Sequence, residues 1–163
     1  MPQSAPEFLR GRAVRSFRYL LREAEAVTAA ESVRFARSDW PAHRFGIGQD
    51  GSIAGIVYHV AAWKQVTLPL LAKNGPILPI EEFDRSSAPA LNDWSGLLNW
   101  LKSVGEAWNE TALALPDSAF DELRNWGSET ITLTEYIAEM VEHDTQHAAQ
   151  IEYLRQLLRV EAG

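Results

Sequence analysis

The sequence contains no cysteine, and this absence removes a whole set of structures and chemistries from consideration. Disulfide bonds, thiolate ligands to a metal and a cysteine nucleophile are all excluded, so any thiol chemistry requires a thiol from outside the chain. A chain without cysteine also fits a reducing compartment. Any reactive group must therefore come from other side chains.

Long apolar runs are also missing. The first ten residues, M-P-Q-S-A-P-E-F-L-R, lack the apolar core of a signal peptide, and no later run approaches membrane-spanning length. Apolar residues make up 46% and charged residues 23% of the 163 residues, which is typical of a globular protein. We expect a single soluble domain over residues 1–163, located in the cytoplasm.

The chain has too little positive charge for nucleic acid to be its main partner. Lys and Arg number 15 against 22 Asp and Glu, which gives a net charge of −7. Phosphate binding requires a basic face. Five early arginines alternate with apolar residues, as on the solvent side of an amphipathic helix. They are Arg10, Arg12, Arg15, Arg18 and Arg22.

Four segments with helical spacing of apolar residues account for most of the sequence, and stretches rich in Pro, Gly, Asp and Ser separate them. We expect helices at about residues 6–31, 52–69, 92–115 and 132–159. The second is apolar on nearly every side, as in a helix enclosed by neighbours. Four long helices predict an all-α fold, a four-helix bundle. The long crossover between the second and third would allow these two to run parallel.

Two local signals precede the last helix. A turn at Trp126-Gly127-Ser128 lies in a segment that predicts a short β-hairpin. Thr132 and Glu135 form a capping box, T-L-T-E, in which each side chain accepts a hydrogen bond from a backbone N–H. The last helix is therefore expected to begin directly after the hairpin.

The last helix carries two histidines one turn apart, in the sequence H-D-T-Q-H from His143 to His147. At about 100° per residue, both fall within the apolar stripe of the helix. A buried polar group without a hydrogen-bond partner costs about 1–3 kcal/mol, and two protonated neighbours would repel. A shared divalent cation removes both problems, because histidines spaced i, i+4 can direct their nitrogens at one point.

Two histidines make a poor metal site, and His59 is the candidate for a third ligand. It lies midway along the second helix. Gly55 one turn before it leaves open space, and Trp63 one turn after it is a candidate pocket wall. Three neutral histidines with an unfilled position are typical of a catalytic metal site. The alternative is a set of hydrogen-bonded core histidines. His43, in a loop sequence rich in Pro and Gly, is expected at the surface.

The sequence H-D-T-Q-H also has the form H-D-x-x-H, an aspartate version of the metalloprotease motif H-E-x-x-H. Asp144 would then be the general base. The sixteen residues after His147 leave no room for the usual downstream ligand helix, and no strand-rich edge is present to bind a peptide. We therefore favour the three-histidine site.

Other side chains are candidates to support that site. Gln150, about 60° around the helix from the second histidine of the pair, is a candidate to orient a ligand or substrate. Glu139, one turn before the first, is a candidate to accept a histidine N–H or to act as a base, although we favour a solvent-facing side chain. Trp63 and Tyr136 are candidate pocket residues, and core packing explains them equally well.

The sequence resembles the DinB/YfiT-like family of metalloenzymes. The likeness covers essentially the whole chain. It is carried by I-V-Y-H-V-A-A-W in the second helix, by H-D-T-Q-H-A-A-Q-I-E-Y-L in the fourth, and by the Trp-Gly turn and T-L-T-E cap between them. It implies a four-helix bundle of up-down-down-up topology, often dimeric. It also implies a divalent metal ion, zinc or nickel, held by His59, His143 and His147.

Characterised members of this family include thiol transferases that use bacillithiol or mycothiol, and the mycothiol-dependent maleylpyruvate isomerase has a similar metal-binding domain. The resemblance implies a metal-dependent enzyme, either a thiol S-transferase or a small-molecule hydrolase. It implies a small-molecule substrate, a low-molecular-weight thiol as candidate cosubstrate, a homodimer, and no nucleic acid or membrane partner. A non-catalytic dimeric bundle that binds a metal or a ligand is the alternative. Nothing in the sequence itself picks out a thiol.

Overall fold

Four long helices make up most of the computed structural model, which describes residues 4–36, 50–72, 83–126 and 129–162. These helices are α1 (Ala5–Glu25), α4 (Ile53–Leu71), α5 (Trp94–Ala114) and α6 (Leu133–Ala162). The shorter elements are α2 (Ala29–Ser32), the 3₁₀ turns η2 (Arg85–Ser87) and η3 (Asp117–Ala119), and the antiparallel hairpin of β1 (Leu123–Trp126) and β2 (Glu129–Thr132). The predicted all-α bundle is confirmed, and the predicted hairpin precedes α6.

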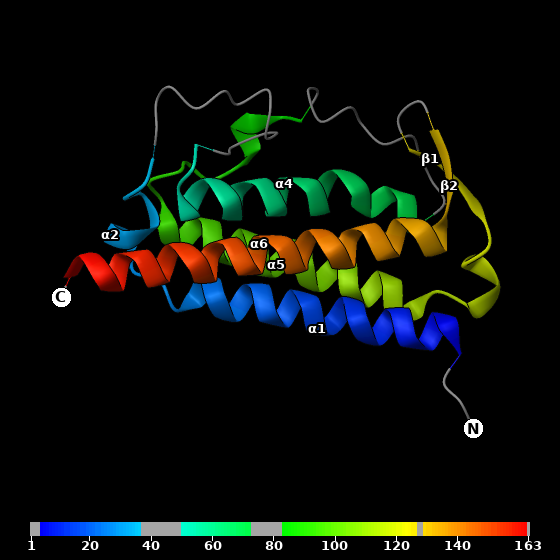
Figure 1. Ribbon diagram of the computed structural model, residues 1–163. Helices are drawn as coiled ribbons and strands as arrows, with labels where there is room; N and C mark the ends of the chain where they lie inside the picture. Colours follow the sequence, from blue (N-terminus) through cyan, green and yellow to red (C-terminus); the bar gives the residue numbers. More distant parts are fainter. Residues whose placement is uncertain (1–3, 37–49, 73–82, 127–128, 163) are drawn as a thin grey trace.

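The long helices run up, down, down and up (Figure 1). Two contacts show that α1 and α6 are parallel. Tyr19 donates a hydrogen bond to Glu152, and one turn later along both helices Glu23 pairs with Arg155. α4 and α5 run together in the opposite direction (Figure 1). The chain therefore returns along the length of the bundle between the end of α4 and the start of α5, as the long crossover predicted.

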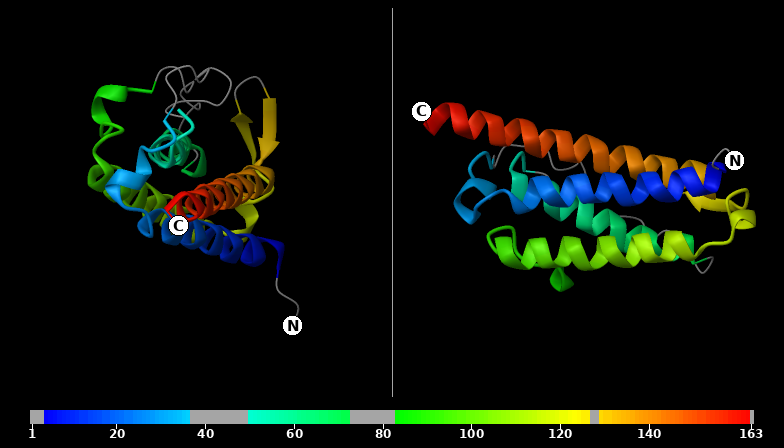
Figure 2. Two further views of the ribbon diagram at one scale, coloured as in Figure 1. Left: turned by 60° about the vertical axis from the view of Figure 1, so that its left-hand side comes forward. Right: turned by 90° about the horizontal axis from the view of Figure 1, so that it is seen from below.

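The four helices form two closely packed pairs and two sparser interfaces. α1 packs along α6 and α4 along α5, whereas α4 contacts α6 and α1 contacts α5 less extensively, as Figure 2 also shows. We name the sparser interfaces the α4–α6 seam and the α1–α5 seam. The α4–α6 seam comprises His59, Trp63, Lys64 and Thr67 facing Tyr136, His143, Asp144 and His147. The α1–α5 seam comprises Val14, Phe17, Arg18 and Leu21 facing Lys102, Gly105, Glu106 and Asn109.

Side-chain caps set where α4 and α6 begin. Ser52 accepts a hydrogen bond from the backbone N–H of Gly55 at 2.9 Å, which starts α4. At α6, the Glu135 carboxylate accepts from the backbone N–H of Thr132 at 2.7 Å, and Thr132 accepts from the backbone N–H of Glu135 at 3.2 Å. The predicted capping box is thus present, and it fixes the start of the helix that carries two histidines.

The predicted first helix over residues 6–31 is wrong at its end. α1 ends at Glu25, and a second capping box starts α2. In this box Thr28 accepts from the backbone N–H of Glu31 at 3.3 Å, and the Glu31 carboxylate accepts from the backbone N–H of Thr28 at 2.8 Å. A capping box inside a run of helical spacing begins a new helix. The apolar spacing alone does not reveal the break.

The core extends along the whole bundle in two clusters of buried apolar side chains. One includes Phe17, Leu20, Val57, Leu97, Leu101 and Ile151, and the other includes Leu70, Trp108, Ala112, Phe120, Tyr136 and Ile137. In the part of the chain that the structure describes, no helix has both the length and the apolar character needed to cross a bilayer.

Candidate metal centre

The α4–α6 seam brings three imidazole rings together. His59 projects from α4, and His143 and His147 project from α6. The Nε2 atoms of His59 and His143 lie 3.0 Å apart. Ring centroids lie 5.1 Å apart for His59 and His143, 4.9 Å for His59 and His147, and 4.4 Å for His143 and His147. The structure therefore brings together the three histidines that the sequence predicts as metal ligands.

This arrangement fits a divalent ion. One ring nitrogen from each histidine lies within 4.8 Å of the others, and no carboxylate belongs to the group. Two ligands that are each about 2.0–2.1 Å from one ion lie about 3.0–3.4 Å apart at ordinary coordination angles. The nitrogens of His59 and His143 already have that spacing.

Gln150 sets the orientation of one of these rings. His147 donates a hydrogen bond from Nδ1 to Gln150 Oε1 at 2.7 Å. This bond places the proton on Nδ1, so the lone pair of Nε2 is available as a ligand. Gln150 is exposed, whereas His147 is only 6% exposed. Gln150 thus contacts a candidate metal ligand, and its role as an orienting residue stays a prediction.

Burial favours the neutral, metal-binding form of the two histidines on α6. Burial has the largest effect on His143, and together with the neighbouring imidazoles of His147 and His59 and the charge of Lys64 it lowers the pKa of this residue to about 2. Burial also lowers the pKa of His147, although the bond to Gln150 opposes that shift. A neutral imidazole does not have to lose a proton before it coordinates a cation.

Two stacked indoles border the histidines. The Trp63 ring lies 6.2 Å from His59 and 6.3 Å from His143, edge to face in both cases. Trp126, the last residue of β1, stacks on Trp63 at 5.9 Å with an interplanar angle of 18°. The hairpin therefore extends the wall that Trp63 begins. The sequence predicts only a turn at Trp126 and contains no signal for its stacking partner.

The family model of the DinB superfamily matches residues 39–151, a range that contains all three histidines. This chain belongs to the DinB superfamily. The predicted family is thereby confirmed. No curated protein matches the chain.

Two other candidate residues of this DinB chain, Tyr136 and Glu139, make no direct hydrogen bond to the three histidines among the described residues. Tyr136 is fully buried, and its hydroxyl donates to the backbone oxygen of Thr67 at 3.2 Å and accepts from Trp108 Nε1 at 2.9 Å. Burial strongly raises the pKa of Tyr136. Glu139 is exposed, and the structure gives it no hydrogen bond to an imidazole among the described residues. Tyr136 is a core residue, and Glu139 is the solvent-facing side chain that we favoured. His43 lies outside the described residues.

The aspartate of the H-D-x-x-H motif faces the bundle core. Asp144 is 2% exposed, and its Oδ2 accepts a hydrogen bond from Lys64 Nζ at 2.9 Å. Burial raises the pKa of Asp144, and the charge of Lys64 opposes that shift. A metalloprotease base must reach water and substrate beside the metal. The geometry of this DinB chain therefore does not support the metalloprotease interpretation.

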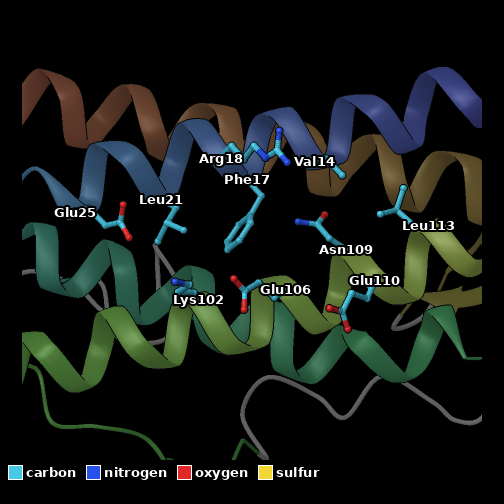
Figure 3. A pocket seen from close by; sticks show the side chains of 10 residues that line it. All are labelled: Val14, Phe17, Arg18, Leu21, Glu25, Lys102, Glu106, Asn109, Glu110 and Leu113. Carbon is cyan, nitrogen blue, oxygen red and sulfur yellow. The ribbon is translucent and has the colours of Figure 1, made fainter.

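The α1–α5 seam holds a groove of about 530 Å³, and none of the three histidines lines it (Figure 3). Phe17 and Leu21 form part of its apolar floor, and Arg18, Lys102 and Glu106 are among the charged residues at its edges. Asn109 is 9% exposed and projects toward Phe17 in Figure 3. In this DinB chain the groove and the histidines thus lie in different interfaces of the bundle.

Proposed function

We propose that the chain is a metal-dependent enzyme in which His59, His143 and His147 hold one divalent ion, zinc or nickel. The observation that carries the proposal is the convergence of three buried or half-buried imidazoles from two helices, with ligand atoms within 4.8 Å of one another. Three protein ligands leave coordination positions for a substrate, as in catalytic rather than structural metal sites.

Such an ion, when bound, lowers the pKa of a coordinated water or thiol and so supplies a nucleophile near neutral pH. The chain's own residues prepare the site. Gln150 holds the His147 ring in one tautomer, and burial keeps His143 neutral. Trp63 and Trp126 provide an apolar wall that keeps water from one side and offers a surface to an organic substrate.

We propose thiol transfer to a small electrophilic molecule as the reaction class. Because the chain has no cysteine, the thiol must be an external low-molecular-weight cosubstrate, for which a cytoplasmic location is suitable. Hydrolysis of a small ester or amide would use the same ion and the same histidines. The two reactions differ in whether product formation depends on added thiol.

The first test is the metal content of purified, untagged protein. We expect about one ion per chain by elemental analysis, in line with a single three-ligand site. Zinc or nickel added to metal-free protein should raise its melting temperature by mass action. The Asn109→Leu variant, changed in the α1–α5 seam, is the matched control and should retain the metal. A wild-type protein that holds no stoichiometric metal and is not stabilised by either ion would refute the proposal.

The second test separates the reaction classes. The metal-loaded protein is incubated with a panel of electrophiles, esters and amides, with and without a low-molecular-weight thiol. Product that forms only with thiol supports the transferase, and substrate loss without thiol indicates the hydrolase. Metal held without exchangeable water, together with no turnover, would indicate a non-catalytic metal-binding bundle. Sedimentation of the same sample tests the proposed homodimer.

A further inference from the structure

A buried ion pair lies where the four long helices meet. Lys64 Nζ on α4 donates to Asp144 Oδ2 on α6 at 2.9 Å, and the two side chains are 1% and 2% exposed. The rings of Phe17 on α1 and Trp108 on α5 lie 5.1 Å and 4.8 Å from the same ammonium group. Side chains from three other helices therefore surround the charge that α4 provides.

Stability is a poor explanation for this pair. Removing two charges from water is costly, and apolar residues of similar size often replace a buried ion pair without loss of stability.

The position of the pair suggests a different role. Asp144 directly follows His143, and Lys64 lies five residues after His59 and next to Trp63. The pair therefore links α4 to α6 beside the histidines, across an interface where direct helix contacts are sparse. The bond from Tyr136 to Thr67 links the same helices, but Tyr136 lies two turns before His143. Of these two links between α4 and α6, neither of which involves a histidine, the ion pair lies closer to the three histidines.

We propose that Lys64 and Asp144 are positioning residues that fix the register of α6 against α4, so that His143 and His147 face His59. This inference rests on the proposed metal site. A rotation of α6 by one residue, about 100°, would turn both of its histidines out of the seam. A charged hydrogen bond between two buried groups is directional, and buried polar pairs are best attested in this register-setting role.

The test uses the double variant Lys64→Met and Asp144→Val, which removes both charges and leaves neither unpaired. Zinc affinity is measured by competition with a chelator, folding by circular dichroism and thermal melting, and ligand geometry by the visible spectrum of the cobalt-loaded protein. We expect a folded variant with about 10- to 100-fold weaker zinc binding, the range seen when groups that support metal ligands are removed. The cobalt spectrum should also change.

The matched control is Glu23→Gln with Arg155→Met, which removes another interhelical pair, partly buried and between α1 and α6. We expect this variant to change in melting temperature while its zinc affinity and cobalt spectrum stay those of the wild type. Should the Lys64 double variant fold and bind zinc with wild-type affinity and spectrum, the positioning role is overturned while the metal site stands. A wild-type protein that binds no zinc overturns both proposals.

If the double variant does not fold, Lys64→Gln with Asp144→Asn supplies the measurement. The two amides keep the approximate size of both side chains, remove both charges and leave neither charge unpaired. We expect zinc affinity to fall by about tenfold, at the lower end of the same range. Wild-type zinc affinity in the folded amide variant, in that case, overturns the positioning role.

Discussion

The two seams of this bundle are filled in different ways. Polar side chains close the α4–α6 seam by meeting one another: imidazole faces imidazole, and Lys64 pairs with Asp144. The α1–α5 seam is open as a groove, and its charged residues form no ion pair with one another among the described residues. Charges at the edge of a groove stay hydrated and cost little. Buried polar groups must be compensated, so their convergence is the stronger sign of a site.

The seams also differ in which side chains fill the space between the helices. At the α1–α5 seam, the Phe17 ring lies so near Gly105 that a methyl group there would come within 2.0 Å of its Cζ atom. At the α4–α6 seam, imidazoles, an indole and an ion pair separate the helices. One seam is therefore set by the fit of an aromatic ring against a glycine, and the other by polar links. Four predictions test this contrast.

The largest effect is expected from His143→Ala. Removal of one of three ligands should weaken zinc binding by about 100-fold or more, beyond the effect of losing a supporting group. The Asn109→Leu protein should bind zinc as the wild type does. Chelator competition on both variants gives the answer. An equal loss of zinc affinity in His143→Ala and Asn109→Leu would mean that the two seams are not functionally distinct.

The next effect concerns the fit of Phe17. An exposed helical glycine changed to alanine usually gains about 1 kcal/mol, but Gly105→Ala should lose about 1–3 kcal/mol because the added methyl displaces the ring. The free energy of unfolding in urea measures this. Gly11→Ala is the matched control, because its nearest neighbour is a flexible arginine tip, Arg15, at 3.3 Å. A more stable Gly105→Ala protein would contradict the close packing of this seam.

The third effect, measured as a slope per pH unit, is expected from pH on the metal-free protein. Burial and neighbouring charges lower the pKa of His143 from 6.5 to about 2. The unfolded chain therefore binds a proton that the folded chain does not, and the stability present above pH 6.5 is lost as the pH falls. The slope is about 1.4 kcal/mol per pH unit for one such group. The free energy of unfolding of His143→Asn should fall less steeply with decreasing pH than that of the wild type. Identical slopes would show that the half-buried His143 ring does not stay neutral in the folded protein.

The smallest effect is expected from Asn109→Leu on stability. The amide oxygen of Asn109 is buried without a hydrogen-bond partner among the described residues. Replacing such a group by an apolar one of similar size should be neutral or stabilising by up to about 1 kcal/mol. A loss of more than this amount in urea unfolding would show that Asn109 makes an interaction in solution.

Much of the candidate metal centre could be predicted from local sequence patterns. The angular positions of His143 and His147 follow from 3.6 residues per turn and the apolar stripe around them. The start of α6 follows from Thr132 and Glu135. These features depend on short stretches of chain, and the structure agrees with them.

Features that depend on several helices at once could not be predicted in this way. The burial of Lys64 depends on Phe17, Trp108 and Asp144, which come from three other helices. The stacking of Trp126 on Trp63 depends on where the hairpin docks. A lysine within an otherwise apolar helix was the available signal for the ion pair. Its partner became identifiable only when the packing of α6 was known.

The most direct test is the X-ray absorption spectrum of the zinc-loaded protein. We predict one zinc environment with three imidazole ligands, reduced to two in His143→Ala. Zinc surrounded only by oxygen ligands, or by the same number of imidazoles in both proteins, would contradict the three-histidine centre.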